Sequence, residues 1–87
     1  MPRKRRMTRL SANMRWLRVK NDYTQQFIAD LLGVTRYAVC KYESGDRVPN
    51  ALGLRKIAHM YQVTIDDLLN VDMSGVFTRE EDKDEAV

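Results

Sequence analysis

Apolar residues recur at helical spacing through most of residues 10–70. The first set lies three to four positions apart, on one face of a helix: Leu10, Met14 and Leu17. Ser11 is a residue type that caps helix N-termini, so we predict a first helix that begins there and runs to about Lys20. The Asn-Asp pair at 21–22 should end it.

Two short helices with a tight connection follow. Thr24 can cap a helix over residues 25–32, and Gly33 can end it, since glycine enters the left-handed conformation at little cost. The side chains predicted to face inward from this helix are Phe27, Ile28, Leu31 and Leu32. Thr35 can then cap a third helix over residues 36–43.

The pattern continues with two more helices. Asn50 can cap a fourth helix, and Thr64 can open a last short one with the sequence "IDDLL". The apolar positions of the fourth helix are Leu54, Ile57, Ala58 and Tyr61. No segment has a convincing strand pattern, so we predict an all-α fold, a compact bundle of five helices.

The connection between the second and third helices is only "GVT". Two short helices joined by a glycine-containing turn of three to four residues are the signature of a helix-turn-helix. Ala29 is small where the two backbones would approach, and Gly33 makes the turn. The apolar contacts that would fix the crossing come from Ile28, Leu32, Val34, Val39 and Tyr42.

The third helix divides into two faces when its residues are spaced about 100° apart. The outward sector, roughly 140° wide, holds Arg36, Tyr37, Cys40 and Lys41. The opposite sector holds Ala38, Val39 and Tyr42. Arginine and lysine donate to guanine O6 and N7, and aromatic or apolar atoms touch thymine methyls, so this face suits a DNA major groove. The alternative is an ordinary solvated face, for which Tyr37 and Cys40 are poor choices.

Cys40 is the chain's only cysteine. On the outward face it would make a small apolar contact, or it would be a thiol whose oxidation blocks binding. A single cysteine forms no internal disulfide, and one cysteine with one histidine cannot assemble the usual metal-ligand sets. We therefore expect no metal and no cofactor.

Charge is unevenly distributed along these 87 residues, although the net charge is only +3. Residues 1–21 contain eight basic residues and no acid, whereas the last stretch is mostly acidic. The arm, residues 1–9, could follow a minor groove or backbone flank, could be only a solvated end, or could resemble a nuclear-localisation run. We use the name arm cations for the cluster Arg3, Lys4, Arg5 and Arg6 within it. The acidic end is expected to stay solvated.

Other function classes find little support in the sequence. No apolar run approaches the ~20 residues of a membrane span, and no apolar segment follows the basic N-terminus as in a secretory signal. The expected location is therefore the cytoplasm. No acid–base pair, activated nucleophile or phosphate-cradling loop is present, so we do not expect an enzyme.

Four segments, "TQQ", "LLGVTR", "YESGDRVP" and "LRKIAHMYQVTIDDLL", make residues 10–70 resemble the lambda-repressor-like, Xre/Cro-type helix-turn-helix domain family. The family is mainly bacterial and phage-borne. The resemblance implies double-stranded operator DNA as partner, bound by a homodimer on a two-fold symmetric site, with the helix 36–43 in the major groove. Residues 71–87 would then be a C-terminal extension that contributes to dimerisation.

The resemblance also assigns roles to single residues. Base contacts fall to Arg36, Tyr37 and Lys41, and Cys40 joins them through its place on the same helix face. Backbone contacts fall to Gln25, Thr35, Ser44 and Arg47, and the charge pattern adds the arm cations. Gln25 can in addition support a neighbouring side chain in the groove. Arg18 and Glu43 match a partly buried ion pair that ties the first helix to the recognition helix.

Two positions depart from the family pattern. Asp46 stands where relatives commonly carry a lysine, which removes one expected phosphate contact. Trp16 stands where the residue is often charged, and it would either pack on the core, against Val76 or Phe77, or form a partner surface.

Two functions remain open. A repressor that occludes a promoter is the leading one. The other is an antitoxin or controller that also binds a partner protein, through residues 71–77.

Overall fold

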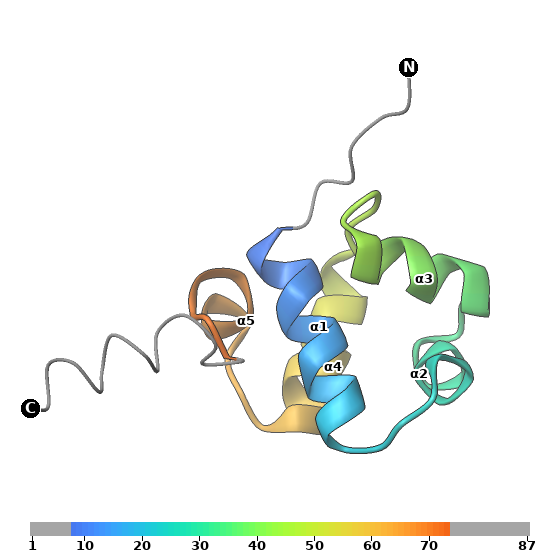
Figure 1. Ribbon diagram of the computed structural model, residues 1–87, viewed down its shortest axis with the longest axis horizontal. Helices are drawn as coiled ribbons and strands as arrows, with labels where there is room; N and C mark the ends of the chain where they lie inside the picture. Colours follow the sequence, from blue (N-terminus) through green and yellow to red (C-terminus); the bar gives the residue numbers. More distant parts are fainter. Residues whose placement is uncertain (1–7, 74–87) are drawn as a thin grey trace, which may run out of the picture.

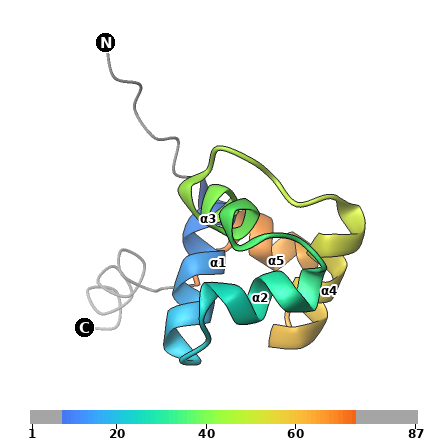
Figure 2. The ribbon, with the colours of Figure 1, turned by 90° about the vertical axis from the view of Figure 1, so that its right-hand side faces the viewer.

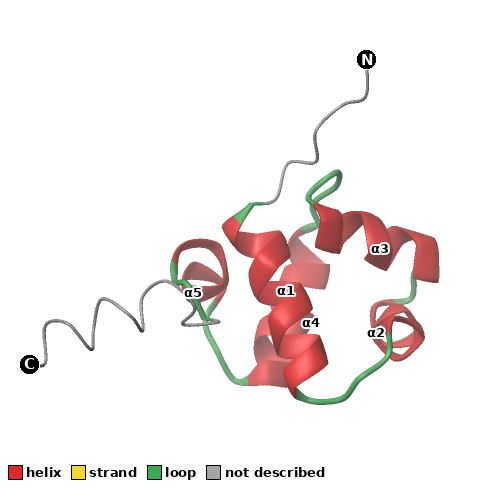
Figure 3. Ribbon diagram, viewed as in Figure 1, coloured by secondary structure: helices red, strands yellow, loops and turns green. Residues whose placement is uncertain are grey.

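The computed structural model describes residues 8–73, and the regular secondary structure of this part is entirely helical (Figure 3). The helices in chain order are α1 (Arg9–Lys20), α2 (Gln25–Leu32), α3 (Arg36–Ser44), α4 (Ala51–Tyr61) and α5 (Ile65–Asn70). The predicted all-α bundle is confirmed for these residues. None of these helices is long and apolar enough to cross a membrane. The arm cations at 3–6, together with Val76 and Phe77, lie outside the described residues.

Every helix opens on a side-chain oxygen that accepts the N–H three residues ahead. Four of the caps are the predicted ones, at Thr24, Thr35, Asn50 and Thr64. The prediction for the first helix was wrong, because the cap is Thr8 and Ser11 stands at the third helical position. The Thr8 hydroxyl accepts from the Ser11 N–H at 3.0 Å, and the Ser11 hydroxyl oxygen accepts from the Thr8 N–H at 2.8 Å. Both residues are good cappers, and this reciprocal capping box uses both.

The main core lies where α1 meets α4 and α5 (Figure 1). Its buried members are Leu10, Met14, Leu17, Ile57, Ala58 and Leu68. Trp16 is half-buried against this cluster, with the Lys20 ammonium 4.7 Å from its ring centroid. Of the two interpretations of Trp16, the structure therefore agrees with packing on the core. The suggested contacts at 76 and 77 lie outside the described residues.

A buried amide closes the bundle between α1 and the end of α5. Asn13 is only 1% exposed, and its Nδ2 donates to the carbonyls of Leu68 at 2.9 Å and Val71 at 2.6 Å. Its Oδ1 accepts from the Met73 N–H at 3.0 Å. A helix leaves its last carbonyls without intrahelical partners, so Asn13 satisfies the carbonyl of the buried Leu68, which would otherwise lack one.

A smaller core joins α2 to α3, which cross in front of α1 (Figure 2). Ile28, Ala29 and Val39 are its buried members, and Ala29 and Val39 are completely inaccessible. Gly33 adopts a left-handed conformation with φ 73°, and the Val34 N–H donates back to the Ala29 carbonyl at 2.9 Å. The predicted turn and its close approach at Ala29 are confirmed.

Phe27 does not point inward, and that part of the prediction was wrong. Its side chain is 45% exposed, and its ring lies 4.7 Å from the ring of Tyr23, centroid to centroid. The short helix α2 buries only Ile28 and Ala29 fully, since a single helical stripe faces α3 and α4. Phe27 lies beside that stripe and covers the turn that leads into α2.

Tyr61 gives the bundle a sensitivity to alkaline pH. Its hydroxyl is buried with no hydrogen-bond partner among the described residues, and this burial, helped by nearby Tyr23 and Glu43, raises its pKa from 10.0 to about 12. The folded state therefore keeps a proton that the unfolded chain loses above pH 10. Stability should fall as pH rises from about 10 to about 12.

The variant Tyr61→Phe should flatten this pH dependence of the unfolding free energy. At pH 7 it should cost little, because it removes an unsatisfied buried hydroxyl and keeps the ring. Denaturant unfolding at several pH values between 7 and 11 measures both effects. Tyr37→Phe is the matched control at an exposed site, and a flattening as large in that variant would contradict the assignment to Tyr61.

Candidate nucleic-acid interface

Helix α3 lies at the edge of the bundle and presents one face to solvent (Figure 1). Arg36, Tyr37 and Cys40 are exposed, and Tyr37 is 62% accessible. On the opposite face Ala38 and Val39 are buried. The two-faced helix predicted from residue spacing is present, and it runs one residue beyond the predicted range, to Ser44.

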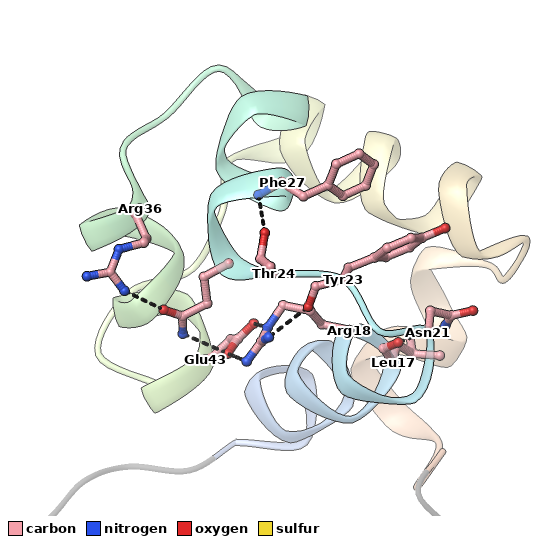
Figure 4. A network of polar contacts seen from close by, with 9 residues as sticks. Leu17, Arg18, Asn21, Tyr23, Thr24, Phe27, Arg36 and Glu43 are labelled. Carbon is pink, nitrogen blue, oxygen red and sulfur yellow. Dashed lines mark hydrogen bonds and ion pairs between the residues drawn. The ribbon is translucent and has the colours of Figure 1, made fainter.

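An ion pair connects the C-terminal end of α3 to α1. Arg18 Nε donates to Glu43 Oε2 at 2.7 Å and Nη2 donates to Oε1 at 3.1 Å, a two-pronged contact in which Glu43 is 5% exposed (Figure 4). Arg18 Nη1 also donates to the Tyr23 carbonyl at 2.9 Å. Arg18 thus connects three parts of the chain, which are α1, α3 and the turn that precedes α2.

Gln25, the first residue of α2, extends this ion pair to the protein surface. Its Nε2 donates to Glu43 Oε1 at 3.1 Å, and its Oε1 accepts from Arg36 Nη1 at 3.2 Å. Both ends of the amide are therefore engaged, and the exposed guanidinium of Arg36 is connected through Gln25 to a buried carboxylate (Figure 4). Such support limits the conformations that Arg36 adopts before any ligand arrives.

Lys41 is held differently, between two neighbours on the same surface. Its ammonium lies 5.1 Å from the Tyr37 ring centroid and 3.6 Å from Asp46 Oδ2. The Ser44 hydroxyl lies 3.1 Å from the same Asp46 oxygen and 3.1 Å from the Lys41 carbonyl, so its single proton is shared between these two acceptors. Asp46 is therefore part of the local structure at the end of α3.

A shallow hollow of about 540 Å³ opens beside α3 at the N-terminus of α2. Thr24, Gln25 and Gln26 line it, and its cations are Arg15, Arg18 and Arg36. A helix N-terminus offers backbone N–H groups and the positive end of the dipole, which suits an anion such as a phosphate. Arg15 was not among the residues predicted from the sequence, although its place on the polar side of α1 was a usable signal.

The remaining residues predicted to meet DNA differ in their exposure. Thr35 and Arg47 are exposed at the start of α3 and in the loop after it, whereas Ser44 is buried, 7% exposed. The Thr35 hydroxyl accepts from the Ala38 N–H at 3.1 Å, which leaves its own proton to donate. The arm cations lie outside the described residues.

Comparison with known proteins gives consistent results across sequence and structure. The family model described as helix-turn-helix matches residues 14–68. Over 54 residues the chain is 43% identical to the HTH-type transcriptional activator BcrR of Enterococcus faecalis, covering 62% of this chain and 26% of BcrR. Over 53 residues it is 40% identical to the HTH-type transcriptional regulator AnsR of Bacillus subtilis, covering 61% and 46%. The chain thus spans less than half the length of either relative.

Solved structures resemble this bundle at lower identity. The DNA-binding domain of the P22 c2 repressor matches with a TM-score of 0.69 at 24% identity, covering 82% of this chain and 93% of that domain. The restriction-modification controller protein C.AhdI of Aeromonas hydrophila matches with a TM-score of 0.62, also at 24% identity, covering 71% and 94%. These similarities establish the lambda-repressor-like arrangement of helices.

Proposed function

The chain belongs to the helix-turn-helix family, and from that membership we propose that it is a DNA-binding transcriptional regulator that inserts α3 into the major groove. The outward face of α3 carries the proposal. On this face Arg36, Tyr37 and Cys40 are exposed and Lys41 is half-buried, and together they offer donors and apolar atoms of the kinds that read base edges. The hollow at the start of α2 would hold the adjacent phosphate.

The operator is proposed to be two-fold symmetric and bound by a homodimer, with the recognition helices ~34–36 Å apart in successive major grooves. The relatives include a regulator and an activator, and the P22 c2 repressor is solved with a synthetic operator. Occlusion of a promoter is the simplest effect of a small bound domain, so we propose that the protein is a repressor. The proposed location is the cytoplasm.

Selection of bound fragments from random double-stranded DNA tests this function. Enrichment of one motif with two inverted half-sites, spaced by about one helical turn, is the expected result. Sedimentation of the protein with and without that DNA then gives the stoichiometry. Recovery of unenriched sequences would refute sequence-specific binding, and a monomer on the selected site would refute the homodimer.

The basic arm should add affinity that depends strongly on salt. Deletion of residues 1–6 removes the four arm cations, and the slope of log affinity against log salt should fall by about 0.9 for every phosphate that those cations neutralise. Binding to the selected site at several salt concentrations measures the slope. A slope equal to that of the full chain would show that the arm is only solvated.

A further inference from the structure

We propose that Asp46 is a positioning residue that directs Lys41 toward base edges and away from the DNA backbone, and so sets how well the protein tells its operator from other DNA. The inference rests on the proposed function and goes one step beyond it. Asp46 itself is not proposed to contact a base. Its effect is exerted through Lys41.

Two groups flank the ammonium of Lys41. Asp46 Oδ2 lies 3.6 Å away on one side and the Tyr37 ring centroid 5.1 Å away on another. The lysine side chain is 31% exposed and the aspartate side chain 20%, so the pair is shielded more than a fully solvated surface pair. The ammonium is therefore held along the exposed face of α3.

Asp46 is in turn fixed by the end of the recognition helix. The Ser44 hydroxyl donates to Asp46 Oδ2 at 3.1 Å, and the Asp46 N–H donates to the Lys41 carbonyl at 3.0 Å. Gly45 before it is left-handed, with φ 89°. The carboxylate thus has a defined place beside Lys41, set by the local backbone.

This arrangement has opposite consequences for bases and for phosphates. An ammonium has three donors, so Lys41 can keep Asp46 as counter-ion and still donate to guanine O6 or N7 in the groove. A contact with a phosphate instead would bring the Asp46 carboxylate toward the negative backbone, and this repulsion opposes that contact. A lysine without such a partner has a flexible stem and a point charge that serves either target.

The variant Asp46→Asn tests the proposal, because asparagine keeps the size and an acceptor for Ser44 and removes the charge. Affinity for unrelated DNA should rise roughly three- to tenfold at low salt, while affinity for the selected operator changes less. The operator-to-unrelated ratio should fall by at least about threefold. On unrelated DNA the slope of log affinity against log salt should steepen by about 0.9, the value for one additional phosphate contact.

Two further variants separate this role from a general charge effect. Asp66→Asn makes the same charge change on α5, which lies away from α3 (Figure 1). It should leave the ratio of operator affinity to unrelated-DNA affinity unchanged. In a Lys41→Met background, Asp46→Asn should no longer change the salt slope on unrelated DNA. Thermal unfolding of each variant shows whether the fold is retained.

The outcomes distinguish the inference from the proposed function. If the unchanged protein shows no sequence preference, the proposed function itself is wrong. If it prefers its operator but Asp46→Asn raises affinity for both DNAs equally, Asp46 acts as a simple repulsive charge and the inference is wrong. An effect of Asp46→Asn that persists without Lys41 would overturn it as well.

Discussion

Arg18→Met should lower the free energy of unfolding by about 3–5 kcal/mol, the largest loss that we expect from a single polar substitution in this domain. The reason is what remains behind. Glu43 is 5% exposed and would keep one hydrogen-bond donor among the described residues, the Gln25 amide at 3.1 Å. Removing a carboxylate from water is unfavourable, and the attraction of its cation normally offsets most of that cost. Without the cation the cost remains.

Chemical denaturation of the single and double variants separates that cause from weakened packing. Arg18→Met combined with Glu43→Leu should be clearly more stable than Arg18→Met alone, because the unpaired carboxylate is gone. The pair between Arg9 and Asp72, 3.4 Å apart with side chains 41% and 9% exposed, supplies the comparison. Arg9→Met should cost clearly less than Arg18→Met, because the Arg9 side chain is 41% exposed to solvent and that of Arg18 only 15%.

A different result would change the assignment of the pair. If Arg18→Met cost no more than Arg9→Met, water would have to solvate Glu43 after the substitution, and the contact would be an ordinary surface pair. If the double variant were as unstable as the single one, the loss would come from the methylene packing of Arg18 rather than from the stranded charge.

The features that the sequence predicted well are those set by residues close together in the chain. A threonine or asparagine cap acts on the N–H three positions ahead, and the two faces of α3 follow from helical spacing alone. Even the error at Ser11 was local, because Thr8 and Ser11 are both capping residues, and only the structure shows how the two share the role.

The features that the sequence did not predict depend on how the helices cross. Asn13 donates to a carbonyl 55 positions away, and nothing in the residues around it identifies that partner. Phe27 has the residue type of a core position, yet the crossing of α2 with its neighbours leaves it 45% exposed. The contact between Lys41 and Asp46 likewise depends on how the chain turns after α3.

At the candidate interface, residue types were informative and their connections were not. A basic and aromatic stripe on one helix is visible in the spacing of Arg36, Tyr37 and Lys41. The resemblance to relatives suggested that Gln25 supports a neighbour, whereas the continuous path from Arg36 through Gln25 to Glu43 is visible only in the structure. Side chains that bond across 11 and 18 positions carry no local signature of doing so.

Arg36→Ala should relax the base preference of the protein at one position of each half-site, at a cost of about 1–3 kcal/mol for the matched base pair. The guanidinium can donate in parallel to guanine O6 and N7, and its contact with Gln25 at 3.2 Å supports it on the exposed side of α3. Binding measured on the selected operator and on single-base variants of it gives the preference at each position.

Arg36 also lies at the rim of the hollow at the start of α2, so a phosphate contact is the competing role. Arg36→Lys separates the two roles because it keeps the charge and removes the planar pair of donors. A base contact predicts that lysine, like alanine, loses the preference at that position while affinity for unrelated DNA is retained. A phosphate contact predicts that lysine binds every sequence nearly as well as arginine does and that alanine weakens all sequences equally, and this pattern would overturn the assignment of Arg36 to a base.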